Sequence, residues 1–438
     1  MKWLTAPVVA ACALWGAPVL AAAPVAAIND LPTDAGYPPE LNAMLTSGRY
    51  QEALDLLNSR PDLLADEKGF LLKIHLLERT GQDDKAVILL EHRLSKDPND
   101  GLARFEIANI HFRHKRERQA TLDYRLALAG GLDDGRAMEA HSRLEGIVQR
   151  KAWHVWAGAA LTANNNLNDT TDITRLAIYG LPFNESAPGG KKDGFAVSGY
   201  VGVGKLIALS PGLGIRTNIL AAGTHDPGRL YDSRSLSIQS GPEWTFGHVS
   251  HVSVNGRAIS QWLGSALAMS GAGLSLHGDT YGNNVLWAGD VSADRLDVKY
   301  KTIGVHWNYR AEVKRVKYLD ASALWIFDAV VARRGATFDT LSFSEQQVKA
   351  GRLLQGPWST FAYVEATARS RQYNSNPLFA GLRRNDTYGQ LLARFSKRDV
   401  VIYGATPYIS VAVQRNDSSI HNYNYKRLRM DIGFTRDF

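Results

Sequence analysis

Residues 302–315 read TIGVHWNYRAEVKR, and their side chains alternate between two kinds with a period of two. One face is apolar and carries Ile303, Val305, Trp307, Tyr309, Ala311 and Val313. The other face is polar and carries His306, Asn308, Arg310, Glu312 and Lys314. Because burying even one unpaired charge costs several kcal/mol, such a row does not fit a dry core. The stretch predicts a barrel strand with its apolar face toward lipid and its polar face toward a wet lumen.

Runs of this kind continue to the end of the chain, and we count fourteen of them between Ala152 and Phe438. Short turns join alternate pairs of runs, at SPG (210–212), FGH (246–248), LDA (319–321) and QGP (355–357). The intervening connections are longer, at 165–192, 224–232, 372–386 and 415–422. Short turns on one rim and long loops on the other are typical of an outer-membrane barrel, and an even strand number returns both ends to the periplasmic side. We therefore predict a transmembrane antiparallel β-barrel of about 14 strands over residues 151–438.

The composition of the 438-residue chain agrees with a barrel. A mean hydropathy of -0.21 and 21% charged residues exclude a bundle of membrane-spanning helices. They do not exclude a barrel, because barrel strands are apolar only at alternate positions. The net charge is +7, yet the basic residues are spread along the strands and form no dominant run. We therefore expect that the protein does not bind nucleic acid. Around the barrel we expect outer-membrane lipid.

The N-terminus has the pattern of a secretory signal peptide. Lys2 precedes an apolar run that is followed by small residues, which predicts a signal peptide over residues 1–27 with cleavage between residues 21 and 27. Residues 28–39 then form a linker. Cys12 is the single cysteine, and the apolar run before it is short for a lipid-attachment signal. Cleavage would leave no thiol, which excludes disulfides, cysteine-ligated metals and cysteine nucleophiles in the mature protein.

Residues 40–150 are helical by pattern and carry an internal repeat. The pieces GRYQEALDLL, GQDDKAVILL and KRERQATLDY align so that Ala53, Ala86 and Ala120 recur at 33 and 34 residues. A period of 34 residues indicates a tetratricopeptide-like domain. Gly48 and Gly81 precede their alanines at the same spacing, where the turn between two helices favours a residue without a side chain. The predicted fold class is therefore α + β multidomain, with N-terminal tetratricopeptide-like helical repeats and a C-terminal transmembrane antiparallel barrel. We expect the helical domain to lie in the periplasm.

The order of these parts resembles the surface lipoprotein assembly modulator family. The marks that carry the resemblance are NNNLND at 164–169, after the first strand, and the C-terminal YKRLRMDIGFTRDF at 425–438, where Arg436 interrupts the apolar face. The resemblance implies an outer-membrane translocon that exports a client, either a partner lipoprotein or a secreted protein such as a haem- or metal-acquisition factor. Phe438 ends the last strand, as the signal read by the barrel assembly machinery does. Periplasmic chaperones are a further expected partner.

The sequence predicts no catalytic, cofactor-binding or metal-ligating residues, and the client-binding residues stay unidentified. It contains no Gly-x-Ser-x-Gly, no HExxH and no P-loop; GVGKL at 202–206 lacks the spacing of a phosphate cradle. THD at 224–226 and HGD at 277–279 place His beside Asp in expected loops, the minimum for a surface hydrolase. Three functions stay open: the translocon, a general porin or solute channel, and the hydrolase. The helical repeats favour the first, because a diffusion pore needs no periplasmic peptide-binding superhelix.

Overall fold

The computed structural model contains two compact units, a helical unit and a β-barrel unit. The structure describes residues 37–150, 153–167, 175–178, 181–184, 192–210, 212–226, 232–246, 250–299, 304–356, 360–375, 383–397, 400, 402, 405–420 and 423–437. The predicted signal peptide, most of the linker and Phe438 lie outside these residues. Among the described helices, none is both long and apolar enough to cross a membrane.

The helical unit is an array of short helices around a core of leucine, isoleucine and alanine. Its elements are α1 (Pro39–Thr46), α2 (Tyr50–Ser59), the 3-10 helix η1 (Pro61–Leu64), α3 (Glu67–Arg79), α4 (Asp83–Lys96), α5 (Gly101–Arg113), α6 (Glu117–Ala129) and α7 (Asp134–Arg150). The repeating alanines Ala53, Ala86 and Ala120 lie in α2, α4 and α6, and each is 0% exposed. Close-packed helices leave no room for a larger side chain at these positions.

The first helix of each pair ends in the same hydrogen-bonded turn. Gly48, Gly81 and Lys115 adopt left-handed backbone conformations there, with φ of 73°, 72° and 57°. The next residue donates its N–H to a carbonyl near the end of the helix, as Arg49 does to Met44 in the first pair. This is a Schellman turn, which favours glycine because a side chain is strained in the left-handed region. The third pair builds the turn with a lysine in place of the glycine that the first two pairs carry.

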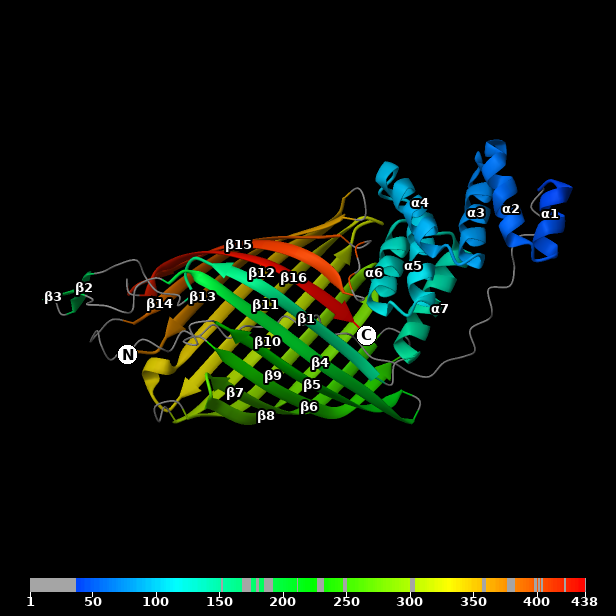
Figure 1. Cartoon of the computed structure of the whole chain (residues 1–438). Coiled ribbons are helices and arrows are strands. Elements are labelled where there is room, and N and C mark those ends of the chain that lie inside the picture. Colours follow the sequence, from blue (N-terminus) through cyan, green and yellow to red (C-terminus); the bar gives the residue numbers. More distant parts are fainter. Residues whose placement is uncertain are drawn as a thin grey trace. The chain divides into compact units, whose positions relative to one another are not determined.

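The β-barrel unit is a closed antiparallel sheet of fourteen strands (Figure 1). The strands are β1 (Trp153–Asn164), β4 (Gly194–Ser210), β5 (Leu213–His225), β6 (Ser233–Phe246), β7 (Ser250–Leu263), β8 (Ala266–Gly282), β9 (Val285–Val298), β10 (Gly304–Tyr318), β11 (Ala323–Ala336), β12 (Phe343–Gln355), β13 (Thr360–Tyr373), β14 (Asn385–Lys397), β15 (Thr406–Ser418) and β16 (Tyr425–Asp437). Between β1 and β4, strands β2 (Arg175–Ile178) and β3 (Leu181–Asn184) pair only with each other, and the 3-10 helix η3 (Asp339–Leu341) precedes β12. The predicted fold class is confirmed.

Strand β10 contains most of the stretch that first indicated a barrel, and its side chains face as predicted. Trp307, Tyr309 and Val313 on the outward face are 45%, 48% and 53% exposed. His306 on the opposite face is 3% exposed. Ile303 lies outside the described residues. Because successive strand residues point to opposite faces, this parity separates a lipid-facing surface from a lumen.

The connections also follow the predicted alternation. The strand bounds leave two to four residues between β4 and β5, β6 and β7, β10 and β11, and β12 and β13, whose connections share one rim. They leave six or more residues between β1 and β4, β5 and β6, β13 and β14, and β15 and β16, whose connections share the other rim. Two connections depart from the rule. The connection 264–265 is a tight turn on the rim with the long loops, and 398–405 is a longer one on the rim with the short turns.

Tryptophan rings with cations stacked on them lie on the outward face, near the rim with the short turns. The pairs, with distances from the cation to the ring centroid, are Lys205 over Trp153 at 4.6 Å, Arg315 over Trp287 at 5.4 Å and Arg352 over Trp325 at 5.3 Å. Each tryptophan lies close to the start of its strand. Aromatic rings and basic side chains at this level form the girdle expected where a barrel meets lipid headgroups.

We expect Val348→Arg to impair folding of the barrel, whereas Gln347→Arg has little effect. Val348 points outward from the middle of β12 and is 58% exposed, while the adjacent Gln347 faces the lumen. A charge on the lipid face near the midplane costs roughly 2–4 kcal/mol, and a charge in the wet lumen avoids that cost. Urea titration in liposomes, read by heat-modifiable gel mobility, measures the difference. Equal destabilisation by both substitutions would contradict the assignment of the two faces.

We expect Lys115→Gly to stabilise the helical unit by about 1 kcal/mol, because it removes a left-handed non-glycine residue. Gly81→Ala should destabilise the helical unit by a similar amount. A Cβ at Gly81 would meet open space, so the effect there is conformational rather than steric. Thermal unfolding of the full chain in detergent, followed by the helical circular dichroism signal, provides the measurement. A change of the same sign for both variants would argue against this explanation.

Candidate functional site

The lumen-facing side chains of the barrel form the candidate functional site. They alternate with the outward apolar residues on every strand, and many are buried against their neighbours although polar. Buried examples are Asn255, Ser275, Ser292, Ser410, Gln414 and Asn416. An interior of this kind holds water and polar groups rather than a dry core.

The lumen residues predicted on β10 face inward, and three of them, Asn308, Arg310 and Glu312, bind one another or a neighbouring strand. The Arg310 guanidinium donates to Glu312 Oε2 at 2.6 Å. Arg334 on β11 donates through Nε to Asn308 Oδ1 at 3.0 Å. A charge that is neutralised within the wall is largely satisfied there, so it has little tendency to hold a passing molecule.

The lumen side of β11–β16 is rich in arginine. Its basic residues are Arg334, Lys349, Arg369, Arg371, Arg394, Arg427 and Arg429, and its acidic residues are Asp328, Glu345, Glu365, Asp386 and Asp431. Arg371 Nε donates to Glu345 Oε2 at 2.7 Å, and Arg384, just before β14, donates to Asp386 at 2.9 Å. Because basic groups outnumber acidic ones, this part of the wall carries a positive field.

Two of these arginines also stack on tyrosines of the same side of the lumen. Arg369 lies 4.4 Å from the ring centroid of Tyr388, and Arg394 lies 4.5 Å from that of Tyr408. Tyr388 is the direct cross-strand partner of Arg369. Stacking holds the planar guanidinium against the ring and leaves its N–H groups at the edge. We call Arg369 and Arg394, together with their ring partners Tyr388 and Tyr408, the arginine–tyrosine wall of β13–β15.

The lumen side of β5–β10 has the opposite character. Its acidic residues are Glu243, Asp279, Asp290, Asp294 and Glu312, its basic residues are Arg216, Arg257, Arg310 and Lys314, and it also carries His251, His277 and His306. His251 Nδ1 lies 3.2 Å from Asp279 Oδ2, and both side chains are 6% exposed. Carboxylates outnumber the permanent cations here, so the field across the lumen points from the arginine-rich side toward this side.

The two His–Asp motifs do not come together. His225 ends β5 and binds Asp232, at 3.1 Å, rather than its neighbour Asp226. The expectation that His277 and Asp279 lie in a loop is wrong: both lie within β8 and face the lumen. Residues two apart on a strand share a face, which is why both of these side chains point inward.

The glycines of GVGKL have a structural role in the barrel wall. Gly202 and Gly204 lie on β4 and face the lumen, beside Trp156 on β1. A Cβ added at Gly202 would lie 2.1 Å from the Trp156 ring. The missing side chain therefore makes room for the indole ring, which points into the lumen. This supports a structural role for the motif, in which small residues reduce the thickness of the barrel wall.

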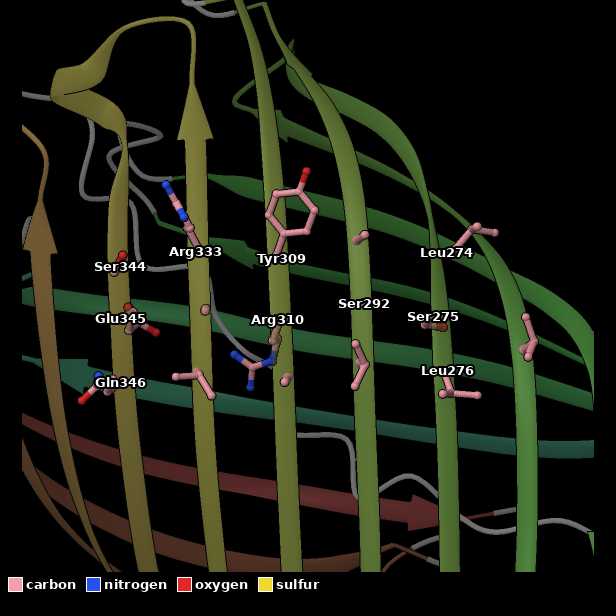
Figure 2. A pocket seen from close by; sticks show the side chains of 16 residues that line it. Leu274, Ser275, Leu276, Ser292, Tyr309, Arg310, Arg333, Ser344, Glu345 and Gln346 are labelled. Atoms are coloured by element: carbon pink, nitrogen blue, oxygen red, sulfur yellow. The ribbon is translucent and has the colours of Figure 1, made fainter.

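A hollow of about 680 Å³ lies over β7–β12 (Figure 2). Leu274, Leu276 and Tyr309 line it, and all three are exposed on the outward face. Its surface is apolar, so it is a depression in the lipid-facing wall and not part of the polar lumen. We expect the hydrocarbon chains of membrane lipids to occupy this depression.

Sequence reasoning missed the arginine–tyrosine wall, although β13 carries a visible signal for it. Arg369, Arg371 and Tyr373 follow one another at alternate positions and therefore share a face. The aromatic partners of Arg369 and Arg394 lie on neighbouring strands, and the register of those strands decides which residues meet. Alternation within one strand does not contain that information.

We expect Glu345→Gln to destabilise the barrel by roughly 1–3 kcal/mol, because it leaves the nearby Arg371 guanidinium without its anion. Asp417→Asn is the matched control, since Asp417 binds Arg415 in an exposed pair whose side chains are 54% and 62% exposed. Exposed pairs contribute about 0–1 kcal/mol, so the control should change little. Urea titration in liposomes compares the two variants. No loss of stability in Glu345→Gln would show that the lumen solvates Arg371 as well as the carboxylate does.

Solved barrels resemble this chain weakly. A loop-deletion mutant of OmpT from Vibrio cholerae is 12% identical with a TM-score of 0.36, over 66% of this chain and 100% of that one. The channel DcaP of Acinetobacter baumannii is 8% identical with a TM-score of 0.40, over 65% and 96%. OpdK of Pseudomonas aeruginosa with vanillate is 8% identical with a TM-score of 0.35, over 65% and 99%. Likenesses at this level do not bear on function, and no curated protein matches the sequence.

The model of one protein family, described as surface lipoprotein assembly modifier, matches residues 153–438. The match covers the whole barrel, from the first residue of β1 to the C-terminus. It confirms the resemblance inferred from the sequence, and together with the apolar outer face and polar lumen it makes this an outer-membrane barrel protein. Because the match spans well over half of its residues, the chain belongs to the surface lipoprotein assembly modifier family.

Proposed function

We propose that the protein is a translocon that exports a client protein across the outer membrane. The client is a surface lipoprotein, or a secreted protein that acquires haem or metal, and the protein itself catalyses no reaction. The helical unit is a periplasmic tetratricopeptide-like domain that recruits the client. Membership of the surface lipoprotein assembly modifier family supports the lipoprotein client.

The observation that carries the proposal is the regular helical array that precedes the barrel. Three helix pairs place a buried alanine and a Schellman turn at equivalent positions, the turns at Gly48, Gly81 and Lys115. Stacked helix pairs of this kind form superhelices with a concave face that suits an extended or helical peptide. A channel for passive diffusion of solutes would not need such a domain.

The lumen supports the same proposal. Its charges are held in local pairs such as Arg310 with Glu312, so they can solvate a moving chain without binding it tightly. The arginine–tyrosine wall adds stacked rings and guanidinium edges, which contact peptide groups and side chains of many kinds. A broad set of weak contacts suits a passage for protein better than a tight site does.

We expect deletion of residues 40–150 to abolish or sharply reduce surface display of the client and to leave the barrel in the membrane. The barrel closes through β1 and β16, which the deletion does not touch. Strains with the full protein, the deletion or neither, and with a candidate exported lipoprotein encoded nearby, are probed with an antibody on intact cells.

Heat-modifiable mobility of the shortened protein controls for insertion of the barrel. Equal display of the client in all three strains would contradict the translocon and favour the solute channel. If display requires the barrel but not residues 40–150, the export function is supported and the recruiting role of the helical unit is contradicted.

A further inference from the structure

Three potential metal ligands lie together in the helical unit. His75 and Glu78 project from α3, and Glu106 projects from α5. One ligand atom of each lies within 4.8 Å of the other two. His75 and Glu78 are three residues apart, which places them on one face of a helix. The cluster therefore joins the first helices of two successive pairs.

The two carboxylates are buried, and one of their oxygens has no hydrogen-bond donor. Glu106 is 4% exposed, and the Glu78 side chain is 7% exposed. Glu78 Oε2 accepts from Arg113 at 2.7 Å, whereas Glu78 Oε1 is buried without a hydrogen-bond partner. A buried carboxylate oxygen that lacks a donor has lost its hydration without replacement. This atom indicates that the site takes a further cationic group.

A proton on His75 partly meets that need. Burial raises the pKa of Glu106, although His75, Asn109 and Arg136 act to lower it. Burial also works against the charged forms of His75 and Glu78, yet their mutual hydrogen bond raises the pKa of His75 and lowers that of Glu78. The hydrogen bond thus favours a charged His75 beside a charged Glu78, and Glu106 adds a second carboxyl group at the same place.

Outer hydrogen bonds hold the ligands in position. Asn109 Nδ2 donates to Glu106 Oε2 at 3.3 Å, and the Tyr124 hydroxyl donates to Asn109 Oδ1 at 2.6 Å. Tyr124 is fully buried and Asn109 nearly so. Metal-binding side chains usually have such partners, because they fix the orientation of the ligand before the ion arrives.

We propose that His75, Glu78 and Glu106 bind a divalent transition-metal ion such as Zn²⁺. One imidazole nitrogen and two carboxylate oxygens are a ligand set that suits Zn²⁺, and three protein ligands leave a position for water or another group. By linking α3 to α5, the ion stabilises the helical unit.

The experiment uses the full-length chain in detergent, with Co²⁺ as a spectroscopic probe and Zn²⁺ as the competitor. We compare the natural protein with Glu106→Gln, His75→Gln and the control His114→Gln. His114 is an exposed histidine that lies 2.7 Å from Asp83 and does not belong to the cluster. The visible Co²⁺ bands and the metal content after dialysis are the two readouts.

We expect the natural protein and His114→Gln to bind one ion more than the cluster variants, or to bind it at least tenfold more tightly. The helical circular dichroism signal checks the fold, and Glu106→Gln should keep it because glutamine has nearly the same volume and still accepts from Asn109. If Glu106→Gln unfolds, His75→Gln decides, since the His75 side chain is 29% exposed and lies at the edge of the core. Equal binding by all four proteins, or no binding by the natural one, would overturn the proposal and leave a buried ion pair.

Discussion

The pairing of β1 with β16 is the constraint on which the rest of the barrel depends. It extends from Trp156 to Asn164 on β1, and it leaves no edge strand in the closed sheet. In lipid, a backbone group without a hydrogen bond costs several kcal/mol, so only a closed sheet is stable there. Side chains reinforce the seam, because Asp431 accepts hydrogen bonds from Thr162 at 2.7 Å and from Ser410 at 2.8 Å.

Closure has a chemical consequence for the charged residues. Once the sheet is closed, every inward side chain shares the lumen with its cross-strand neighbours, and opposite charges can meet there. Arg371 with Glu345 and Arg216 with Glu243 are such pairs. The lumen is therefore polar enough to hold water, while its charges are largely neutralised along the wall. The excess of arginine on β11–β16 leaves a field across the lumen, which orients a charged or dipolar molecule inside.

The helical unit satisfies its polar groups by a different route. Its hydrophobic core is built from repeated positions, and the polar residues within it form compact networks. Asp123 is 0% exposed and lies 2.9 Å from His111 Nδ1 and 3.4 Å from Arg104. Buried networks of this kind make the register of the helices specific, because a shifted helix would leave a charge unpaired. The cluster of His75, Glu78 and Glu106 is a second buried polar network, but in it Glu78 Oε1 has no hydrogen-bond partner.

The sequence by itself determined the strand number, the two faces of each strand and the alternation of short and long connections, because these are local properties of alternation and turn composition. It also located the helices and the alanines that their packing buries. Only the tertiary structure decided which side chains meet, since strand register and barrel closure join residues far apart in the chain. Asn165 and Asn166, noticed in the sequence as a family mark, bind the backbone of Leu428 and Lys426 across the seam. No local pattern contains that pairing, because it arises only when the first and last strands close the sheet.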